Sequence, residues 1–248
     1  MLAVALAGVA AGTINTVVGS GTLITFPTLL AVGVPPVTAN VTNTIGLVPG
    51  SVSGAIGYRR ELRGQRGRLL RLASASLVGG IIGAVLLLAL PAAAFNAIVP
   101  VLILLGCVLV LLQPTISRKV AARAEHRGGV PEHGALWVWV LVMLTGVYGG
   151  YFGAAQGVLL MAIMGIGIQD SLQRLNGTKN VLAGLVNAVA AVIFIAVAEV
   201  DWLIAGLIAV GSVVGGQIGA TVGRRLPPLA LRMVIVTVGV VAIVAFVS

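Results

Sequence analysis

Apolar runs of about twenty residues recur along this chain of 248 residues, and they leave it few folds to adopt. Leu69–Leu90 and Leu203–Gly223 are two examples. A helix of about 20 apolar residues spans the hydrocarbon core of a bilayer and satisfies its own backbone N–H and C=O groups. Only 8% of the residues are charged, whereas a soluble domain has about 25%. The sequence therefore predicts an all-α polytopic membrane protein.

Two motifs recur at one spacing, which indicates an internal repeat. Ala39–Thr44 aligns with Leu175–Asn180 (175 − 39 = 136), and Gly79–Ala84 aligns with Gly215–Ala220 (215 − 79 = 136). Chance glycine matches are common in a chain with 34 glycines, but repeated motifs at one spacing are not. The predicted divisions of the chain are repeat one at 1–112, a charged linker at 113–134 and repeat two at 135–248.

Each repeat begins with an apolar stretch that glycines and polar residues interrupt. The two arms of this stretch are about 2–16 and 22–33 in repeat one, and about 136–153 and 158–168 in repeat two. Each arm is short for a full span, so the stretch forms either one broken crossing or a hairpin that enters the membrane and returns. The glycines of the two stretches align at a spacing of 138 (146 − 8 = 138), pairing Gly8, Gly12 and Gly19 with Gly146, Gly150 and Gly157.

Charge placement favours the hairpins. With hairpins, and with the Arg59–Arg71 segment in the cytoplasm, 14 of the 15 basic residues are cytoplasmic and none is external, in agreement with the positive-inside rule. Broken crossings would move Arg174, Arg224, Arg225 and Arg232 outside. The prediction is two inverted repeats in the cell membrane, each a re-entrant hairpin plus three transmembrane helices, with the linker cytoplasmic and both termini external. The helices are expected at about 37–58, 69–90, 92–112, 172–198, 202–223 and 227–247.

Lys179 is the one basic residue that this arrangement places deep in the membrane. It lies about 13 Å from the membrane surface along its helix, near the centre of a core about 30 Å thick. The hairpin tips reach the same depth and present helix N-termini, whose N–H groups and positive dipole attract anions. The sequence predicts a midplane site for a small anion, with substrate-binding residues Asn15, Thr16, Gly19, Ser20, Gly21, Thr22, Asn40, Thr42, Asn43, Thr44, Gln156, Gly157, Asn176, Thr178, Lys179, Asn180 and Asn187.

The same residues also have purely structural interpretations. Glycines in membrane helices are packing surfaces, and Asn or Thr side chains bond neighbouring helices. Lys179 reaches the interface instead if its helix begins later than predicted. We predict no catalytic set, metal site or cofactor, since His126 and His133 fall in the linker. The net charge of +9 reports which loops are cytoplasmic rather than a nucleic-acid partner.

Four segments carry a resemblance to a known family. Gly19–Pro27, Ala39–Thr44 and Gly57–Arg60, together with Leu175–Asn180, resemble the TauE/SafE sulfite exporter family, also called the toluene-sulfonate uptake permease group. The resemblance covers nearly the whole chain. It implies transport of small organosulfur or sulfur oxyanions such as sulfite, sulfoacetate or other sulfonates, often by export. Family members often have a third glycine where this chain has Ser20.

The expected function is therefore alternating-access transport of such an anion, with the lipid bilayer as surroundings and no assigned oligomeric state. A membrane-embedded enzyme or assembly factor, or a passive anion channel, is the alternative. Transport is expected to be electrogenic and to need no coupled cation, since no acidic residue lies at depth to carry a proton. The six acidic residues fall in loops or at helix ends: Glu61, Glu125, Glu132, Asp170, Glu199 and Asp201.

Overall fold

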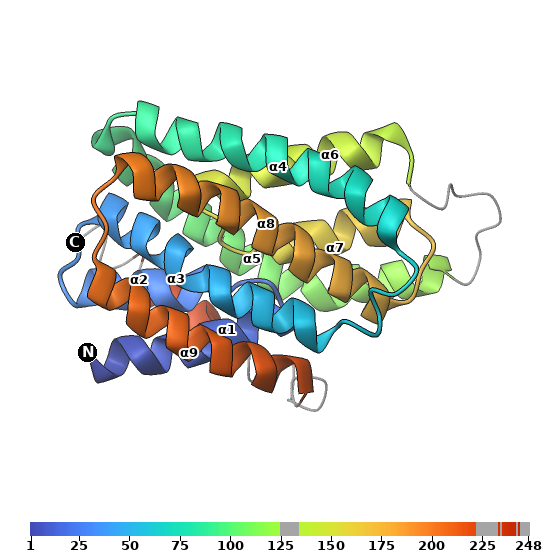
Figure 1. Cartoon of the computed structure of the whole chain (residues 1–248), viewed down its shortest axis with the longest axis horizontal. Coiled ribbons are helices and arrows are strands. Elements are labelled where there is room, and N and C mark those ends of the chain that lie inside the picture. Colours follow the sequence, from blue (N-terminus) through green and yellow to red (C-terminus); the bar gives the residue numbers. More distant parts are fainter. Residues whose placement is uncertain (125–133, 222–232, 234, 242, 244–248) are drawn as a thin grey trace.

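The computed structural model describes residues 1–124, 134–221, 233, 235–241 and 243. Throughout these residues the regular structure is α-helical, and most helices lie side by side along one long axis (Figure 1). This confirms the predicted fold class. The helices are α1 Leu2–Val17, α2 Thr22–Ala31, α3 Pro36–Gly57, α4 Arg66–Ala89, α5 Ala92–Ala124, α6 Leu136–Tyr151, α7 Gln156–Gly167, α8 Leu172–Val197 and α9 Trp202–Thr221.

Four helices in the described part of the chain are long and apolar enough to cross a membrane: α4, residues Ala92–Ile116 of α5, α8 and α9. The helices α1, α2, α6 and α7 are apolar but shorter. Helix α3 has 22 residues and contains many Asn, Thr and Ser residues, and it is not among these four. The predicted helix at 227–247 lies mostly outside the described residues, as do Arg224, Arg225 and Arg232.

Helix α5 is longer than predicted. The apolar run suggests an end at residue 112, whereas the helix continues to Ala124 and contains Pro114. Proline removes one backbone hydrogen bond, which costs stability but does not always end a helix. The residues after Ile116 are mainly Ala, Arg, Lys and Val, and three of these four favour helix. Apolar length reports where the membrane ends, not where the helix ends.

The interrupted stretch of each half folds back on itself. Helix α2 returns toward the end of the bundle at which α1 begins, and α7 returns toward the start of α6 (Figure 1). At the second hairpin, a Cβ atom built on Gly167 would lie 2.7 Å from the ring of Trp137, so the end of α7 contacts the start of α6. The tip of that hairpin is closed by a hydrogen bond from the Tyr148 hydroxyl to the Ala154 carbonyl.

The two tips correspond at a spacing of 134 residues, not the 138 that glycine matching suggests. Gly19 and Gly153 are the residues with positive φ, 86° and 78°, just after α1 and α6 (153 − 19 = 134). Each donates its N–H to the carbonyl five residues earlier, at 3.0 Å and 3.1 Å. The two spacings differ by four residues, which is about one helical turn. Matching the glycines therefore aligns α6 with α1 on the correct helix face but one turn out of register.

Contacts between helices reveal their directions. Cβ atoms built on Gly8 and Gly12 would touch Ile208 and Ser212 in turn, so α1 and α9 run parallel. Helices α4 and α6 pack in parallel in the same way. Gly177 and Gly184 lie against Tyr58 and Ser51, so α3 and α8 run antiparallel.

The first helix of each half thus packs against the fourth helical element of the other half, α1 with α9 and α6 with α4. This reciprocal packing of α1 on α9 and of α6 on α4 supports the two-repeat prediction. It also requires close approach of backbones, which only glycine permits at several points.

Replacing one of these glycines is expected to destabilise the protein. A Cβ atom on Gly215 would lie 2.8 Å from the Thr13 nitrogen and closer still to the Val9 carbonyl, both backbone atoms that cannot move aside. We expect Gly215→Ala to lower the free energy of unfolding by about 1–3 kcal/mol and to lower the thermal midpoint in detergent. Gly206, which has nothing within 4 Å of its Cβ position, is the matched control. Gly206→Ala should leave the midpoint unchanged or raise it, and an equal loss in both variants would contradict this packing.

Candidate functional site

Lys179 lies in α8 with its side chain fully buried. Its ammonium donates hydrogen bonds to the backbone carbonyls of Asn15 at 3.2 Å and Thr16 at 3.0 Å. These carbonyls belong to the last turn of α1, where helical C=O groups have no partner within the helix and the dipole is negative. The carbonyls at the end of α1, the first arm of the first hairpin, thus accept the hydrogen bonds of the buried ammonium. Within the described residues no carboxylate pairs with Lys179, since both ion pairs there involve Asp170.

The Thr16 carbonyl is the point on which several donors converge. Besides Lys179, the side-chain amides of Asn176 and Asn180 approach it, each at 3.4 Å. A carbonyl oxygen has two lone pairs, so the shorter lysine bond dominates and the amide contacts are weak. Asn176 also donates to the Tyr58 hydroxyl at 2.8 Å. Five predicted site residues therefore meet here: Asn15, Thr16, Asn176, Lys179 and Asn180.

The two hairpin tips touch beside this cluster. The Gly157 N–H donates to the Gly19 carbonyl at 3.0 Å, and a Cβ atom on Gly19 would overlap the Gly157 Cα. A Cβ atom on Gly157 would lie 3.0 Å from Cδ of Lys179. The predicted anion cradle at the start of α7 is thus occupied in this conformation, because the N–H groups of Gln156, Gly157 and Val158 all have backbone acceptors.

A second polar group surrounds the start of α2. The Asn43 side chain donates to the Thr22 hydroxyl at 3.4 Å and accepts a hydrogen bond from the Thr25 hydroxyl. Thr25 donates as well to the carbonyl of Gly21, the residue that precedes α2. Asn43 is the repeat counterpart of Lys179 (179 − 136 = 43), and the structure places its side chain against α2, the second arm of the first hairpin.

Three predicted site residues carry buried polar atoms that have no hydrogen-bond partner within the described part of the chain. These atoms are the Ser20 hydroxyl oxygen, Oδ1 of Asn40 and Nε2 of Gln156. Asn40 uses its other amide atom to bond the Tyr151 carbonyl at 2.9 Å. Buried polar atoms in proteins nearly always have a protein, water or ligand partner, so these three atoms have unused capacity for a ligand, as do the hydroxyls of Ser76 and Tyr151.

Four predicted residues lie outside these groups. The Thr178 hydroxyl bonds Gln65 at 3.1 Å, and the Thr42 hydroxyl accepts from the Asp201 N–H at 3.2 Å. The Thr44 hydroxyl bonds back to the Asn40 carbonyl within α3. Asn187 is half-buried, two turns beyond Lys179 in α8.

Sequence reasoning missed Thr25, Tyr58 and Tyr151 as neighbours of the site. Thr25 was detectable, because it follows Thr22 by three residues and so shares its helix face. Tyr58 and Tyr151 come from helix ends far away in sequence, and only the fold brings them to Asn176 and Asn40.

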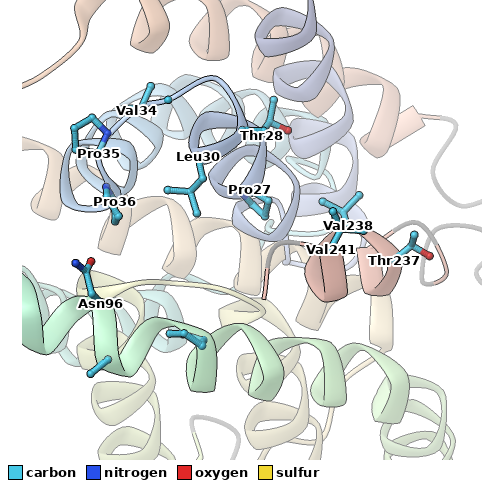
Figure 2. Close-up of a pocket in the computed structure, with 14 residues that line it drawn as sticks. Pro27, Thr28, Leu30, Val34, Pro35, Pro36, Asn96, Thr237, Val238 and Val241 are labelled. Carbon is cyan, nitrogen blue, oxygen red and sulfur yellow. The ribbon is translucent and has the colours of Figure 1, made fainter. Parts of the chain in front are cut away.

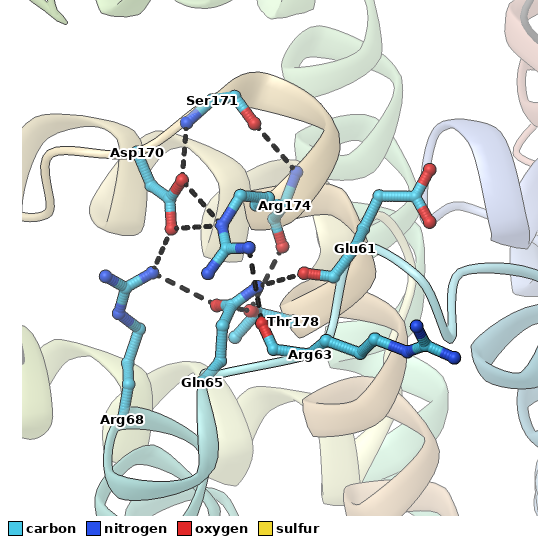
Figure 3. A network of polar contacts seen from close by, with 8 residues as sticks. All are labelled: Glu61, Arg63, Gln65, Arg68, Asp170, Ser171, Arg174 and Thr178. Carbon is cyan, nitrogen blue, oxygen red and sulfur yellow. Dashed lines mark hydrogen bonds and ion pairs between the residues drawn. The ribbon is translucent and has the colours of Figure 1, made fainter.

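Asp170 organises a separate polar network at one end of the bundle (Figure 3). We call this end the linker face, because the loops around Gln65 and Asp170 meet Gly134 there. Asp170 pairs with Arg68 and, at 2.9 Å, with Arg174. Burial alone would raise the pKa of Asp170, but the hydrogen bonds from Arg68 and Arg174 outweigh it and hold the pKa below its usual value of 3.8.

A cavity of about 930 Å³ lies at the opposite end, away from Lys179 (Figure 2). It is lined by the end of α2, the loop into α3, the start of α5 and residues 237–241. Thr28, Asn96 and Thr237 are its polar side chains. None of the predicted site residues lines it, so it is not the predicted anion site.

Long apolar helices, paired short helices and a buried lysine together define a multi-pass α-helical membrane protein with polar groups at its centre. The chain belongs to the Sulfite exporter TauE/SafE family, whose model matches residues 4–246.

Relatives carry names of the same kind. "Probable membrane transporter protein ORF9" of Sinorhizobium sp is 29% identical over 85% of this chain and 78% of its own length. "Probable membrane transporter protein YfcA" of Escherichia coli K12 is 27% identical over 93% of this chain and 83% of its own. No solved structure matches the chain. The family and the names of these relatives indicate a membrane transporter.

The Asp170 pairs predict an acid-sensitive contribution to stability. Because the folded pKa lies below 3.8, the contribution is present above pH 3.8 and is lost as the pH falls through the folded pKa. Removing one partner of a buried pair costs about 3–5 kcal/mol, so Asp170→Asn should unfold at lower temperature than the unaltered protein at pH 7. The gap between the two should shrink below pH 3.8. A gap that stays constant down to pH 3 would contradict this linkage.

Proposed function

We propose that the protein transports small organosulfur or sulfur oxyanions, such as sulfite, sulfoacetate or other sulfonates, and that Lys179 supplies the countercharge. The supporting observation is a fully buried ammonium whose acceptors are neutral carbonyls. A buried charge without a counterion is costly, and an anion would remove that cost. An ammonium has three N–H donors, and the carbonyls of Asn15 and Thr16 account for two, so a third remains for a ligand.

The proposed seat lies where α8 passes the two hairpin tips. The unused polar atoms of Ser20 and Gln156 belong to those tips, one from each half of the chain. Hydroxyl and amide groups can donate to anion oxygens, and the weakly engaged amide of Asn180 can do the same. The bond between Gly157 and Gly19 closes the tips in this conformation. Loading an anion therefore requires the tips to part.

We further propose that the halves, 1–112 and 135–248, are inverted repeats in the cell membrane. The support is the direction of the helices: α1, α3 and α9 run one way, while α4, α6 and α8 run the other. Movement of one repeat against the other around a midplane site is how many secondary transporters alternate their access. The linker face would be cytoplasmic, since the arginine-rich segment Arg59–Arg71 lies there, and its charge would attract anions to that face.

The direction of transport follows from charge. Among the described residues the acidic side chains lie at helix ends or in loops, so no carboxylate at depth is available to carry a proton. An inside-negative potential expels an anion by about 2.3 kcal/mol per charge per 100 mV. We propose electrogenic export that needs no coupled cation.

Reconstituted vesicles test this proposal. In liposomes that contain labelled sulfoacetate, an inside-negative potassium diffusion potential should speed efflux, while Na⁺ or pH gradients should have little effect. Lys179→Ala should reduce saturable efflux at least tenfold, because a charge in a site with little water interacts strongly with its ligand. Arg118→Ala, which alters an exposed residue of α5, is the matched control and should transport normally.

Efflux that ignores voltage and follows the pH gradient would contradict the charge argument, and full activity of Lys179→Ala would contradict the site. Acceleration of labelled efflux by unlabelled substrate on the other side separates a carrier from a passive channel. A thermal-shift screen against sulfite, sulfate, thiosulfate, taurine and sulfoacetate would narrow the substrate, because a ligand bound only by the native state raises stability.

A further inference from the structure

The Asp170 network joins the two halves of the chain at the linker face. Arg68 in α4 donates to Asp170 in the loop between α7 and α8, and both side chains are almost buried, at 6% and 12% exposure. Arg174 in α8 donates to Asp170 and also to the Arg63 carbonyl at 3.3 Å. Every one of these bonds except Arg174–Asp170 crosses from one half to the other (Figure 3).

Gln65 extends the network toward the interior. Its side-chain oxygen accepts from Arg68 at 3.0 Å and from the Thr178 hydroxyl at 3.1 Å. Its amide nitrogen donates to the Glu61 carbonyl at 2.6 Å. Thr178 is the neighbour of Lys179 in α8, so the network extends from the linker face to the turn of α8 that carries the buried lysine.

The repeat spacing of 136 gives this network a counterpart at the other end of the bundle. Thr178 corresponds to Thr42 (178 − 136 = 42) and Gln65 to Asp201 (65 + 136 = 201). These counterparts also bond each other, since the Asp201 N–H donates to the Thr42 hydroxyl at 3.2 Å. The same pair of positions is therefore bonded across the halves at both ends, with the threonine hydroxyl as donor to Gln65 and as acceptor from the Asp201 backbone.

The charged part of the network does not recur. The positions that correspond to Arg68, Asp170 and Arg174 are Ile204, Val34 and Thr38 (68 + 136 = 204, 170 − 136 = 34, 174 − 136 = 38). Val34 instead lines the cavity of about 930 Å³. The linker face is thus held by two ion pairs, of which Arg68–Asp170 is buried, whereas the equivalent loop at the opposite face borders an open space (Figure 2).

We propose that Arg68, Asp170 and Arg174 form the gate of the linker face, closed in this structure, and that no ionic gate forms from the corresponding residues at the opposite face. The proposal rests on alternating access as the proposed function. Opening toward the linker face requires Asp170 to leave Arg68, because the two residues belong to halves that must separate. The buried pair resists this, because Arg68 would lose its carboxylate while Asp170 would keep only Arg174. Among the described residues, the corresponding positions at the opposite face are joined by a neutral hydrogen bond from Asp201 to Thr42 and by no ion pair, so the resting protein favours opening there.

Cysteine accessibility in nanodiscs tests the gate without any substrate, so a failure to transport the chosen anion would leave this result standing. The reporters are Thr178→Cys and Thr42→Cys, each with Cys107→Ala, and the readout is the rate of modification by a hydrophilic maleimide. With the gate intact, Thr178→Cys should react slowly. Adding Asp170→Asn should speed that reaction roughly tenfold or more, because the closed state loses its ion pairs. The same change should slow Thr42→Cys, because the two faces open alternately.

Asp201→Asn is the matched control, since asparagine still caps α9 and the backbone bond to Thr42 is kept. It should leave the reaction of Thr178→Cys unchanged. Arg68→Gln removes the other partner of the same ion pair. It replaces Asp170→Asn if Asp170→Asn fails to fold, and it should change the labelling of both reporters in the same way. Rapid labelling of Thr178→Cys with the gate intact would overturn the proposal. So would an unchanged rate in Asp170→Asn, or acceleration of both reporters together, which indicates loosening rather than gating.

Discussion

The burial of one ammonium group on the carbonyl end of a broken helix organises the centre of this protein. A lysine at this depth is costly unless polar groups meet it, and a helix that stops inside a membrane leaves carbonyls without partners. Lys179 donates to the carbonyls of Asn15 and Thr16 in the last turn of α1. These bonds give the ammonium its acceptors and the unpaired carbonyls their donor, so they lower both costs. The hairpin can therefore end at mid-depth only where α8 passes, which fixes the position of one half of the chain against the other.

Glycine contacts hold the remaining arrangement around this centre. Helix α1 packs closely on α9, and α6 packs closely on α4, so the first helix of each half packs on a helix of the other half. The tips meet through the bond between Gly157 and Gly19, where no side chain fits. The same crossing contacts that stabilise the fold must slide or part if access alternates. The two ends differ in this respect, because among the described residues only the linker face has an ion pair across the halves, between Arg68 and Asp170.

Apolar length and glycine breaks predicted the helices and the two interrupted stretches, because lipid leaves the backbone few options. The predicted depth of Lys179 in the membrane stays a prediction, while the structure shows that its side chain is fully buried within the protein. Its partners were not predictable in the same way, since backbone carbonyls carry no sequence signal, and the lysine was expected to face an anion rather than α1. Thr178 and Thr42 share the motif of the site yet turn toward the two ends of the bundle. A motif gives depth along a helix, but the direction of each side chain depends on neighbours that only the fold supplies.

The central claim is that the ammonium of Lys179, which two carbonyls of α1 hold through two of its three N–H groups, binds the transported anion through the third. The chain has two lysines, Lys119 and Lys179, so a Lys119→Arg variant labelled with ¹⁵N at lysine Nζ gives a single ammonium signal in solid-state NMR. On titration with sulfoacetate this signal should shift and saturate, at the concentration that half-saturates efflux from liposomes. Glucose should leave it unchanged. Saturable sulfoacetate transport with no change in the Lys179 signal would contradict the account.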